Sequence, residues 1–195
     1  MTVLLRDGAV TLRPFAPEEF DAVWAEETRD RGDFETPWSP DDAVARDRVL
    51  ARIRDSGTWR DGRVMDLAVD VDGTVVGDVQ ARRDLHYTPP GIYDLGIGLF
   101  AGQRGQGIGV VAIALITAFL FDEEHAGRVS LSTDVDNAAM RRTAEKAGFR
   151  FEGILRGFWQ VPDEDARDYA LYGRTRSDHD ADRAIAALNP TTPGG

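Results

Sequence analysis

The stretch "QRGQGIG" at residues 103–109 constrains the fold of this chain more than any other feature. It lies between the apolar runs "DLGIGLF" and "VVAIALITAFLF", so it falls where a strand gives way to a helix. Three alternate glycines there give up side-chain packing and raise the entropic cost of ordering the turn. The free amides of such a turn and the positive end of the helix dipole point to the same place, which predicts an anion site, most naturally for phosphate.

Two familiar phosphate motifs do not match this stretch. A Walker loop needs Gly-Lys-Ser/Thr, whereas this chain has Gly107-Ile108-Gly109. The dinucleotide fingerprint G-x-G-x-x-G needs a glycine at the position of Val110, and it needs a repeating parallel βαβ pattern that is absent. A tight turn that binds no ligand is the remaining structural alternative.

The rest of the chain predicts an α+β fold with a sheet of mixed strand direction. Alternating apolar and polar residues on both sides of Asp72-Gly73 indicate a β-hairpin within 64–84. Ser39, followed by Pro40, is expected to cap a helix at its N-terminus. Further strands are expected at 10–15, 92–100, 128–135, 149–159 and 168–175, and helices at 17–27, 39–55, 107–125 and 137–148.

The composition predicts one globular domain and argues against several classes of protein. The 195 residues carry a net charge of −11, which argues against nucleic-acid binding and favours a cationic substrate such as an amine, although acidity also serves solubility alone. Without cysteine there is no disulfide or thiolate nucleophile, and the three histidines are not at metal-ligand spacing, so we expect no metal. The run Val110–Phe121 is too short to span a bilayer, and no signal peptide is recognised, so we expect a cytoplasmic protein without membrane contact.

Two motifs in order identify a resemblance to a known family. "QRGQGIG" is similar to the Q/R-x-x-G-x-G/A signature of the GCN5-related N-acetyltransferase (GNAT) superfamily. "DVDNAAMRRTAEKAGFRFEGILRGFW" is similar to the N-x-x-(A/S)-x-x-x-x-E-K-x-G-F-x-x-E-G region of the same superfamily. The segments "TLRPF" and "DLGIGLF" most resemble the RimJ/RimL-type branch, and the resemblance extends over residues 9–174.

The resemblance implies a fold, a domain organisation and an activity. The fold would be the α/β/α layered GNAT fold, with a mixed, mostly antiparallel sheet of about seven strands, helices on both faces and a splay between the fourth and fifth strands. Residues 1–176 would form a single acetyltransferase domain, and 177–195 a short helix and a frayed tail. The activity would be transfer of an acetyl group from acetyl-CoA, as co-substrate, to a primary amine on a protein N-terminus or a small molecule.

The resemblance also implies the residues that bind coenzyme A. Backbone amides of the glycine turn would hold the pyrophosphate, and the strand before it would pair with the pantetheine arm. Asn137 fits two roles, as the cap of the following helix and as a hydrogen-bond partner of the cofactor arm. Arg141 and Arg142 are either near the 3′-phosphate or simply solvated. The expected cofactor-binding residues are Leu99, Phe100, Arg104, Gly105, Gln106, Gly107, Ile108, Gly109, Asn137 and Arg142.

Asp94 is the candidate general base. It matches the acidic position of the family's fourth strand, and in a regular strand it shares one face with Gly96 and Gly98. A carboxylate beside bare backbone would leave room for a substrate, whereas a bulge would break the alternation. The alternative is an ordinary solvated carboxylate, and Asp78 and Asp84 are weaker candidates.

The general acid is where the chain departs from the family. The usual tyrosine position is Ala144, and the serine of some RimL-like members is Met140, so water, Tyr169, Tyr172 or the substrate itself would have to serve. Large aromatic residues are either core or walls of the acceptor pocket. The pocket candidates are Trp38, Tyr87, Phe158 and Trp159.

Alternatives stay open at this point. The missing acid leaves a sensor that binds acyl-CoA without transfer, and the motif does not exclude a longer donor such as succinyl-CoA. The strands after Phe149 offer an edge and aromatic side chains for a homodimer.

Overall fold

The computed structural model describes residues 3–29, 39–83, 89–160 and 165–188. These residues form eight strands, five α-helices and two short 3-10 helices. The strands are β1 (Leu5–Asp7), β2 (Val10–Arg13), β3 (Val64–Val71), β4 (Thr74–Arg82), β5 (Ile92–Leu99), β6 (Arg128–Asp134), β7 (Arg150–Trp159) and β8 (Arg167–Thr175). The helices are η1 (Pro17–Glu19), α1 (Phe20–Arg29), α2 (Ala43–Arg54), η2 (Ala101–Gln103), α3 (Ile108–Asp122), α4 (Ala138–Lys146) and α5 (Arg176–Leu188).

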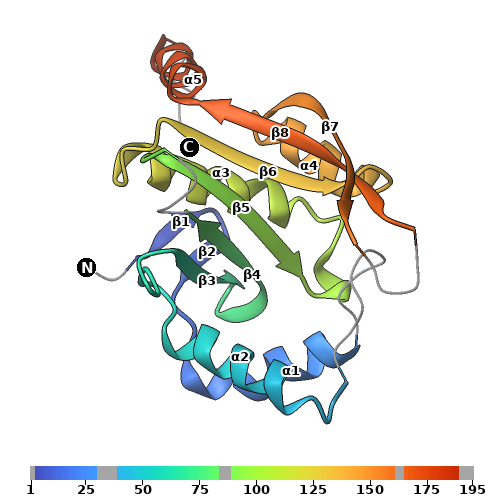
Figure 1. The fold of residues 1–195 in the computed structure, drawn as a ribbon. Helices are drawn as coiled ribbons and strands as arrows, with labels where there is room; N and C mark the ends of the chain where they lie inside the picture. The colour runs from blue at the N-terminus through green and yellow to red at the C-terminus, as the bar shows by residue number, and fades with distance from the viewer. Residues whose placement is uncertain (1–2, 30–38, 84–88, 161–164, 189–195) are drawn as a thin grey trace.

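The strands form a single sheet in the order β1-β2-β3-β4-β5-β6-β8-β7, shown in Figure 1. Every neighbouring pair is antiparallel except β5 and β6, which are parallel. The prediction of a mixed, mostly antiparallel sheet is therefore confirmed, with eight strands in place of about seven. The additional strand is β1, which pairs with β2 across Gly8 and is too short to show periodicity in the sequence.

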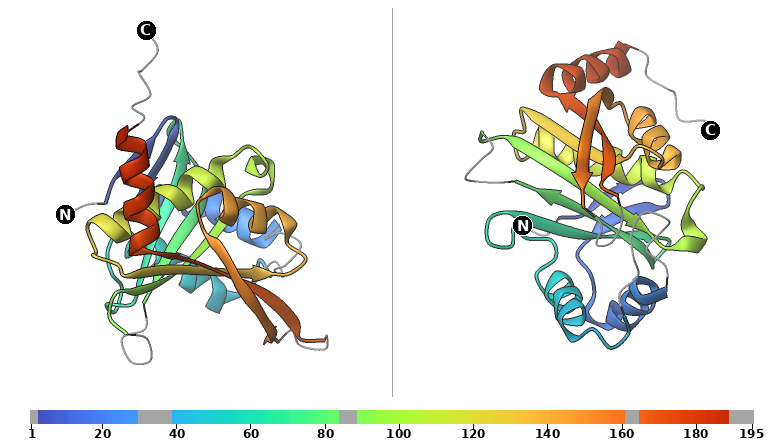
Figure 2. Two further views of the ribbon diagram at one scale, coloured as in Figure 1. Left: turned by 90° about the horizontal axis from the view of Figure 1, so that it is seen from above. Right: turned by 45° about the vertical axis from the view of Figure 1, so that its right-hand side comes forward.

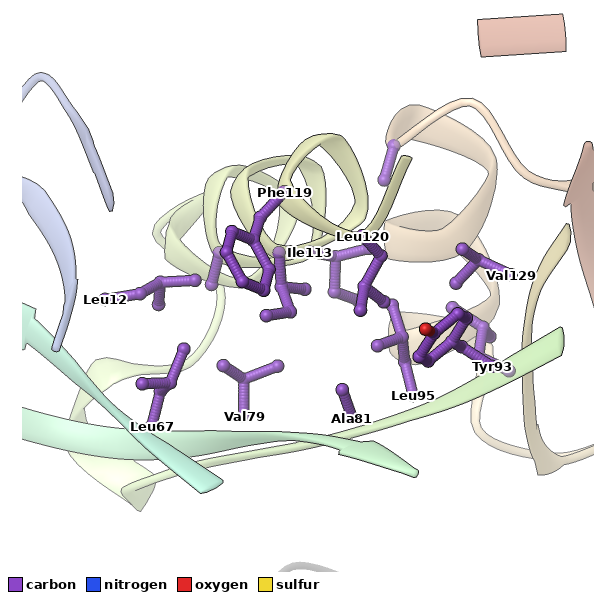
Figure 3. Close-up of a cluster of buried hydrophobic side chains, with 14 of the residues drawn as sticks. Leu12, Leu67, Val79, Ala81, Tyr93, Leu95, Ile113, Phe119, Leu120 and Val129 are labelled. Atoms are coloured by element: carbon purple, nitrogen blue, oxygen red, sulfur yellow. The ribbon is translucent and has the colours of Figure 1, made fainter. Parts of the chain in front are cut away.

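The main core lies between one face of the sheet and α3 (Figure 3). Leu12, Leu67 and Val79 project from the strands toward Ile113 and Leu120 of the helix, and each of the five is almost fully buried. Burying such a side chain stabilises the fold by roughly 1.5–3 kcal/mol. The long apolar run of the sequence is thus a core helix, and none of the helices in the described residues has the length and apolar character to cross a membrane.

The opposite face carries α1 and α2 over the β2–β4 half of the sheet (Figures 1 and 2). A second apolar cluster there joins Phe20 and Val23 of α1 and Val49 of α2 to Ala68 and Val75 of the sheet. Helices on both faces are confirmed. The half of this face formed by β5, β6, β8 and β7 has no helix over it among the described residues, and we call it the open face.

The strands β5 and β6 diverge along their length, as Figure 1 shows. Pairing joins Ile92–Leu95 to Arg128–Leu131, but β5 continues to Leu99 and β6 to Asp134 without further pairs. Counted from β2, the strand predicted to open the sheet, these are the fourth and fifth strands. The predicted splay is therefore confirmed.

Two predicted helix ends are wrong. The second helix begins at Ala43, with the Asp42 carboxylate as N-cap accepting from the Ala45 amide at 2.9 Å. Ser39 instead lies in a turn, where its carbonyl accepts from the Asp42 amide. The helix α3 ends at Asp122, three residues before the expected position.

Candidate active site

The loop between β5 and α3 bends through two left-handed glycines. Gly105 has φ +77° and Gly107 has φ +84°, a conformation that costs roughly 1–2 kcal/mol for a residue with a Cβ. A Cβ built on either glycine would meet no protein atom within 4 Å. The backbone conformation therefore requires these glycines, while the space beside them is open.

Five successive amides of this loop, Gly105–Gly109, donate to no acceptor in the part of the chain that the structure describes. Gly107 is the N-cap of α3, and no side chain caps that end of the helix. The segment from Gly105 to Gly107 is exposed. Uncapped amides and the helix dipole both stabilise negative charge, so this end of α3 suits an anion with several oxygens.

Beyond the four residues paired with β6, one edge of β5 is free of strand pairing. The Phe100 amide donates to the Val76 carbonyl at 2.9 Å, on the β4 side. Because successive residues alternate in direction, the main-chain groups of Ile97 and Leu99 point to the other side, where the Leu99 carbonyl accepts from Arg104 Nε at 2.8 Å. Of the two residues predicted to pair with the cofactor, Leu99 thus lies at the free edge, whereas Phe100 is committed to β4.

Asn137 caps α4, since its Oδ1 accepts from the Met140 amide at 3.0 Å. The structural role predicted for this residue is confirmed, and its contact with the cofactor arm stays a prediction. Arg142 is exposed and has no hydrogen bond or ion pair with the described residues. Arg141 is held inward instead, because its Nε donates to the buried Tyr172 hydroxyl at 3.2 Å.

On the face of the sheet away from α3, Asp94 of β5 lies directly opposite Arg82 of β4. Arg82 donates to Asp94 Oδ2 from Nη2 at 2.7 Å and from Nε at 3.1 Å. A Cβ on Gly96 would lie 3.1 Å from Arg82 Nη2, and one on Gly98 would lie 3.4 Å from the Asp78 carboxylate. The pairing of β4 with β5 is unbroken, so the prediction that Asp94 and the two glycines share a face is confirmed.

The carboxyl of Asp94 is a weaker acid than an ordinary aspartate. Its side chain is 43% exposed, yet the packing around the carboxyl desolvates it and raises its pKa, and the charge of Arg82 offsets this only in part. Among the weaker candidates, Asp78 is mostly buried near Arg52, with 3.6 Å between the charged atoms. Asp84 lies outside the described residues. A raised pKa makes Asp94 a better proton acceptor than an ordinary aspartate.

The expected acid positions carry no proton donor here. Ala144 is fully buried and Met140 packs against the same core. Tyr172 is also fully buried, and its hydroxyl donates to Glu145 Oε1 at 3.3 Å, so it does not reach the open face. The described residues contain no group of three or more His, Asp or Glu side chains placed to hold a metal ion.

Aromatic side chains gather where the β7–β8 hairpin turns. Trp159 stacks on Tyr169 with 6.2 Å between ring centroids, and Phe158 lies 5.2 Å from the same ring. Half of the Trp159 and Phe158 side chains is exposed. The other predicted acceptor-pocket residues, Trp38 and Tyr87, lie outside the described residues.

The strand β7 exposes apolar residues along its length. Phe151 is 50% exposed and Ile154 44% exposed, and β7 is the edge of the sheet. An edge strand with uncovered apolar side chains favours association with another chain. Self-association through β7 stays a prediction.

Sequence reasoning missed Arg82. The alternation of "DVQAR" places this arginine on the same strand face as Asp78 and Gln80, which is a usable signal. It does not reveal that Asp94 lies opposite, because the register of β4 against β5 cannot be read from either strand alone.

Comparisons with known proteins show the family of this chain. Residues 9–150 match the acetyltransferase (GNAT) domain family. No curated protein sequence matches the chain.

Solved structures share the fold at low sequence identity. RimJ from Mycobacterium smegmatis, in complex with CoA-disulfide, has a TM-score of 0.73 and 23% identity, covering 96% of this chain and 94% of that one. RimL, a ribosomal-protein alpha-N-acetyltransferase in complex with coenzyme A, has a TM-score of 0.74 and 15% identity, covering 89% and 98%. The microcin self-immunity acetyltransferase MccE, in complex with acetyl-CoA and AMP, has a TM-score of 0.71 and 18% identity, covering 87% and 93%. Since the family match extends over most of the chain, this protein belongs to the GNAT family of acetyltransferases.

Proposed function

We propose that this protein transfers the acetyl group of acetyl-CoA to a primary amine by direct attack. The observation that carries the proposal is the row of five unpaired amides, Gly105–Gly109, at the uncapped start of α3. A diphosphate presents several anionic oxygens, which such a row of donors satisfies without a cationic side chain. The residues present therefore fit coenzyme A.

The neighbouring residues would hold the rest of the co-substrate. The free edge at Ile97 and Leu99 supplies main-chain groups that an extended pantetheine arm would pair with, in the manner of an added strand. Asn137 would add a contact to that arm, and Arg142 is a solvent-exposed cation available to the 3′-phosphate. When bound, acetyl-CoA supplies a thioester carbonyl carbon as the electrophile.

Asp94 would act on the acceptor. The amine nitrogen forms a bond to the thioester carbonyl carbon, the carbon–sulfur bond breaks, and the sulfur leaves as the CoA thiolate. Asp94 takes the proton that the attacking nitrogen loses, directly or through water. Because the chain has no cysteine, no acyl intermediate forms on a protein sulfur. The thiolate would take its proton from water or from the acceptor, since Ala144 and Met140 cannot donate one.

Two acceptor classes are represented among the similar structures. RimL is described as acting on the N-terminus of a ribosomal protein, and MccE as giving immunity to a microcin. The net charge of −11 favours either kind of cationic acceptor by long-range attraction. The glycine loop would bind the CoA portion, so a longer acyl donor such as succinyl-CoA belongs in the same test.

The test combines calorimetry with a thiol-release assay. We expect CoA to bind the folded protein, and release of free CoA from acetyl-CoA to depend on an added amine. Asp94→Asn should lower kcat by about 100-fold or more with unchanged CoA affinity. Asp55→Asn, which removes an exposed carboxylate paired with Arg54, is the matched control. Tight CoA binding without thiol release for any amine would instead indicate a sensor, and absence of binding would refute the proposal.

A further inference from the structure

Within the part of the chain that the structure describes, Arg82 uses only part of its hydrogen-bonding capacity. A guanidinium has five N–H donors, and two of them, on Nε and Nη2, point at the same oxygen, Asp94 Oδ2. The nearest acceptor for Nη1 among the described residues is Gln80 Oε1, at the outer limit of 3.5 Å. Asp94 Oδ1 accepts no hydrogen bond from the described residues. Among the described residues, the pair therefore keeps unused donors and an unused acceptor side by side.

Arg13, on β2, differs from Arg82 because all of its hydrogen-bond donors have acceptors within the protein. Its guanidinium donates to both oxygens of Glu19, to Asp70 Oδ2 and to a backbone carbonyl. Only 22% of the Arg13 side chain is exposed, against 45% for Arg82. Arg13 ties η1 to the sheet, whereas the Arg82–Asp94 pair ties together two strands that already pair through their backbones.

Gly96 leaves the space in which the Arg82 guanidinium lies. The Arg82 guanidinium lies beside the Gly96 backbone, where a Cβ would be 3.1 Å from Nη2 and 3.4 Å from Nη1. A Cβ here would require the guanidinium to shift by a few tenths of an ångström, and a larger side chain would displace it further. The Arg82 cation of β4 is thus kept next to the candidate base on β5, at the border of the open face, where an acceptor can reach both.

A positive and a negative group at this separation complement a zwitterion. We propose that Arg82 selects acceptors whose primary amine lies one or two carbons from a carboxylate, as in a free amino acid; this rests on the proposed function, with Asp94 as the base. The acceptor amine meets Asp94 Oδ1, and its carboxylate accepts from the free N–H groups of Arg82. A protein N-terminus has no carboxylate at that position, so small amino acids are favoured over N-termini.

The test compares each proteinogenic amino acid with its own α-amide in the thiol-release assay, with rates corrected for the fraction of neutral amine. For the best acceptor, we expect kcat/KM for the acid to exceed kcat/KM for the amide by a factor of about 10 or more. The free energy of charge-assisted hydrogen bonds corresponds to a ratio of this size. Arg82→Gln should abolish this preference by raising KM for the acid and leaving KM for the amide unchanged. Arg82→Lys should keep part of it. Arg54→Gln, which breaks an exposed pair far from the site in sequence, should behave as wild type.

Three outcomes would overturn the inference. Equal rates for acids and amides in the wild type, a measurement that needs no variant, would show that the carboxylate is not read. An equal fall in kcat for acid and amide in Arg82→Gln would show that Arg82 acts on Asp94 and not on the acceptor. In both cases acetyl transfer itself would stand, whereas the absence of thiol release with every amine would remove the proposed function and this inference together.

Discussion

The glycines of the β5–α3 loop and those in the interior of the sheet differ in what an added side chain would meet. A Cβ on Gly105 or Gly107 would project into open space. A Cβ on Gly77 of β4 would collide with the Gly98 carbonyl and lie 2.9 Å from the Leu99 Cα. The sheet glycine therefore makes room for the protein's own backbone, and the loop glycines leave room for something else.

Gly173 of β8 extends the comparison to side chains. A Cβ there would fall on the ion pair between Arg128 of β6 and Glu152 of β7, only 2.5 Å from Arg128 Nη2. The pair crosses over β8 because that strand has no side chain at the crossing. Glycines thus mark packing constraints in the sheet and the proposed CoA-binding surface in the loop, and only their surroundings distinguish the two.

The largest expected effect is that of Gly77→Ala. Two of the three atoms that the new Cβ would meet belong to the β5 backbone, and the third is in the Leu99 side chain, so β4 and β5 would have to separate. We expect the free energy of unfolding to fall by about 3 kcal/mol or more, which lowers the thermal midpoint by about 6 °C or more. Gly102→Ala, whose Cβ meets nothing, should leave the midpoint unchanged. An unaltered midpoint for Gly77→Ala would contradict the close pairing of these strands.

Gly107→Ala should separate binding from stability. The left-handed backbone makes the substitution cost roughly 1–2 kcal/mol of folding free energy, measurable by urea unfolding. The Cβ would also stand where we place the diphosphate, so we expect the Kd for CoA in a calorimetric titration to rise by about 10-fold or more. Wild-type affinity in this variant would mean that CoA phosphates lie elsewhere.

The smallest effect should come from Gly96→Val, which displaces the Arg82 guanidinium. Arg82 lowers the pKa of Asp94 against the raising effect of burial, so its removal should raise that pKa further. In the plot of kcat/KM against pH, corrected for amine ionisation, the rise on the acid side should then shift to higher pH. Because a raised carboxyl pKa means that the folded protein binds the proton more tightly than the unfolded chain, the free energy of unfolding should fall with rising pH over a wider range than in the wild type. If the acid side of this profile does not shift, Asp94 is not the base whose titration limits the rate.

Local chemistry explains which features could be predicted from the sequence. The Asp72-Gly73 turn has φ +51° and +86°, as the predicted hairpin requires. Asn137 caps α4 because its amide oxygen reaches the backbone three residues on. The glycine loop likewise depends on residues close together in the chain, so its left-handed bends follow from the residue types.

The features that were not predicted depend on distant parts of the chain. Ser39 and Asp42 are both good N-caps, and the choice between them depends on where α2 packs against α1 and the sheet. The meeting of Arg82 with Asp94 depends on strand register, which no short segment encodes. Asp94 could therefore be proposed as a candidate base from the sequence, but its cationic neighbour Arg82 could not.

The apolar helix α3 has a consequence for how the protein is made. It has no charged residue before Asp122. It packs against β1, β2, β4 and β5, which precede it in the chain, and against α4, which follows it. Translation therefore delivers most of its covering surface before the helix itself leaves the ribosome. A nascent chain in this order exposes its most aggregation-prone segment only after a place to bury it has been synthesised.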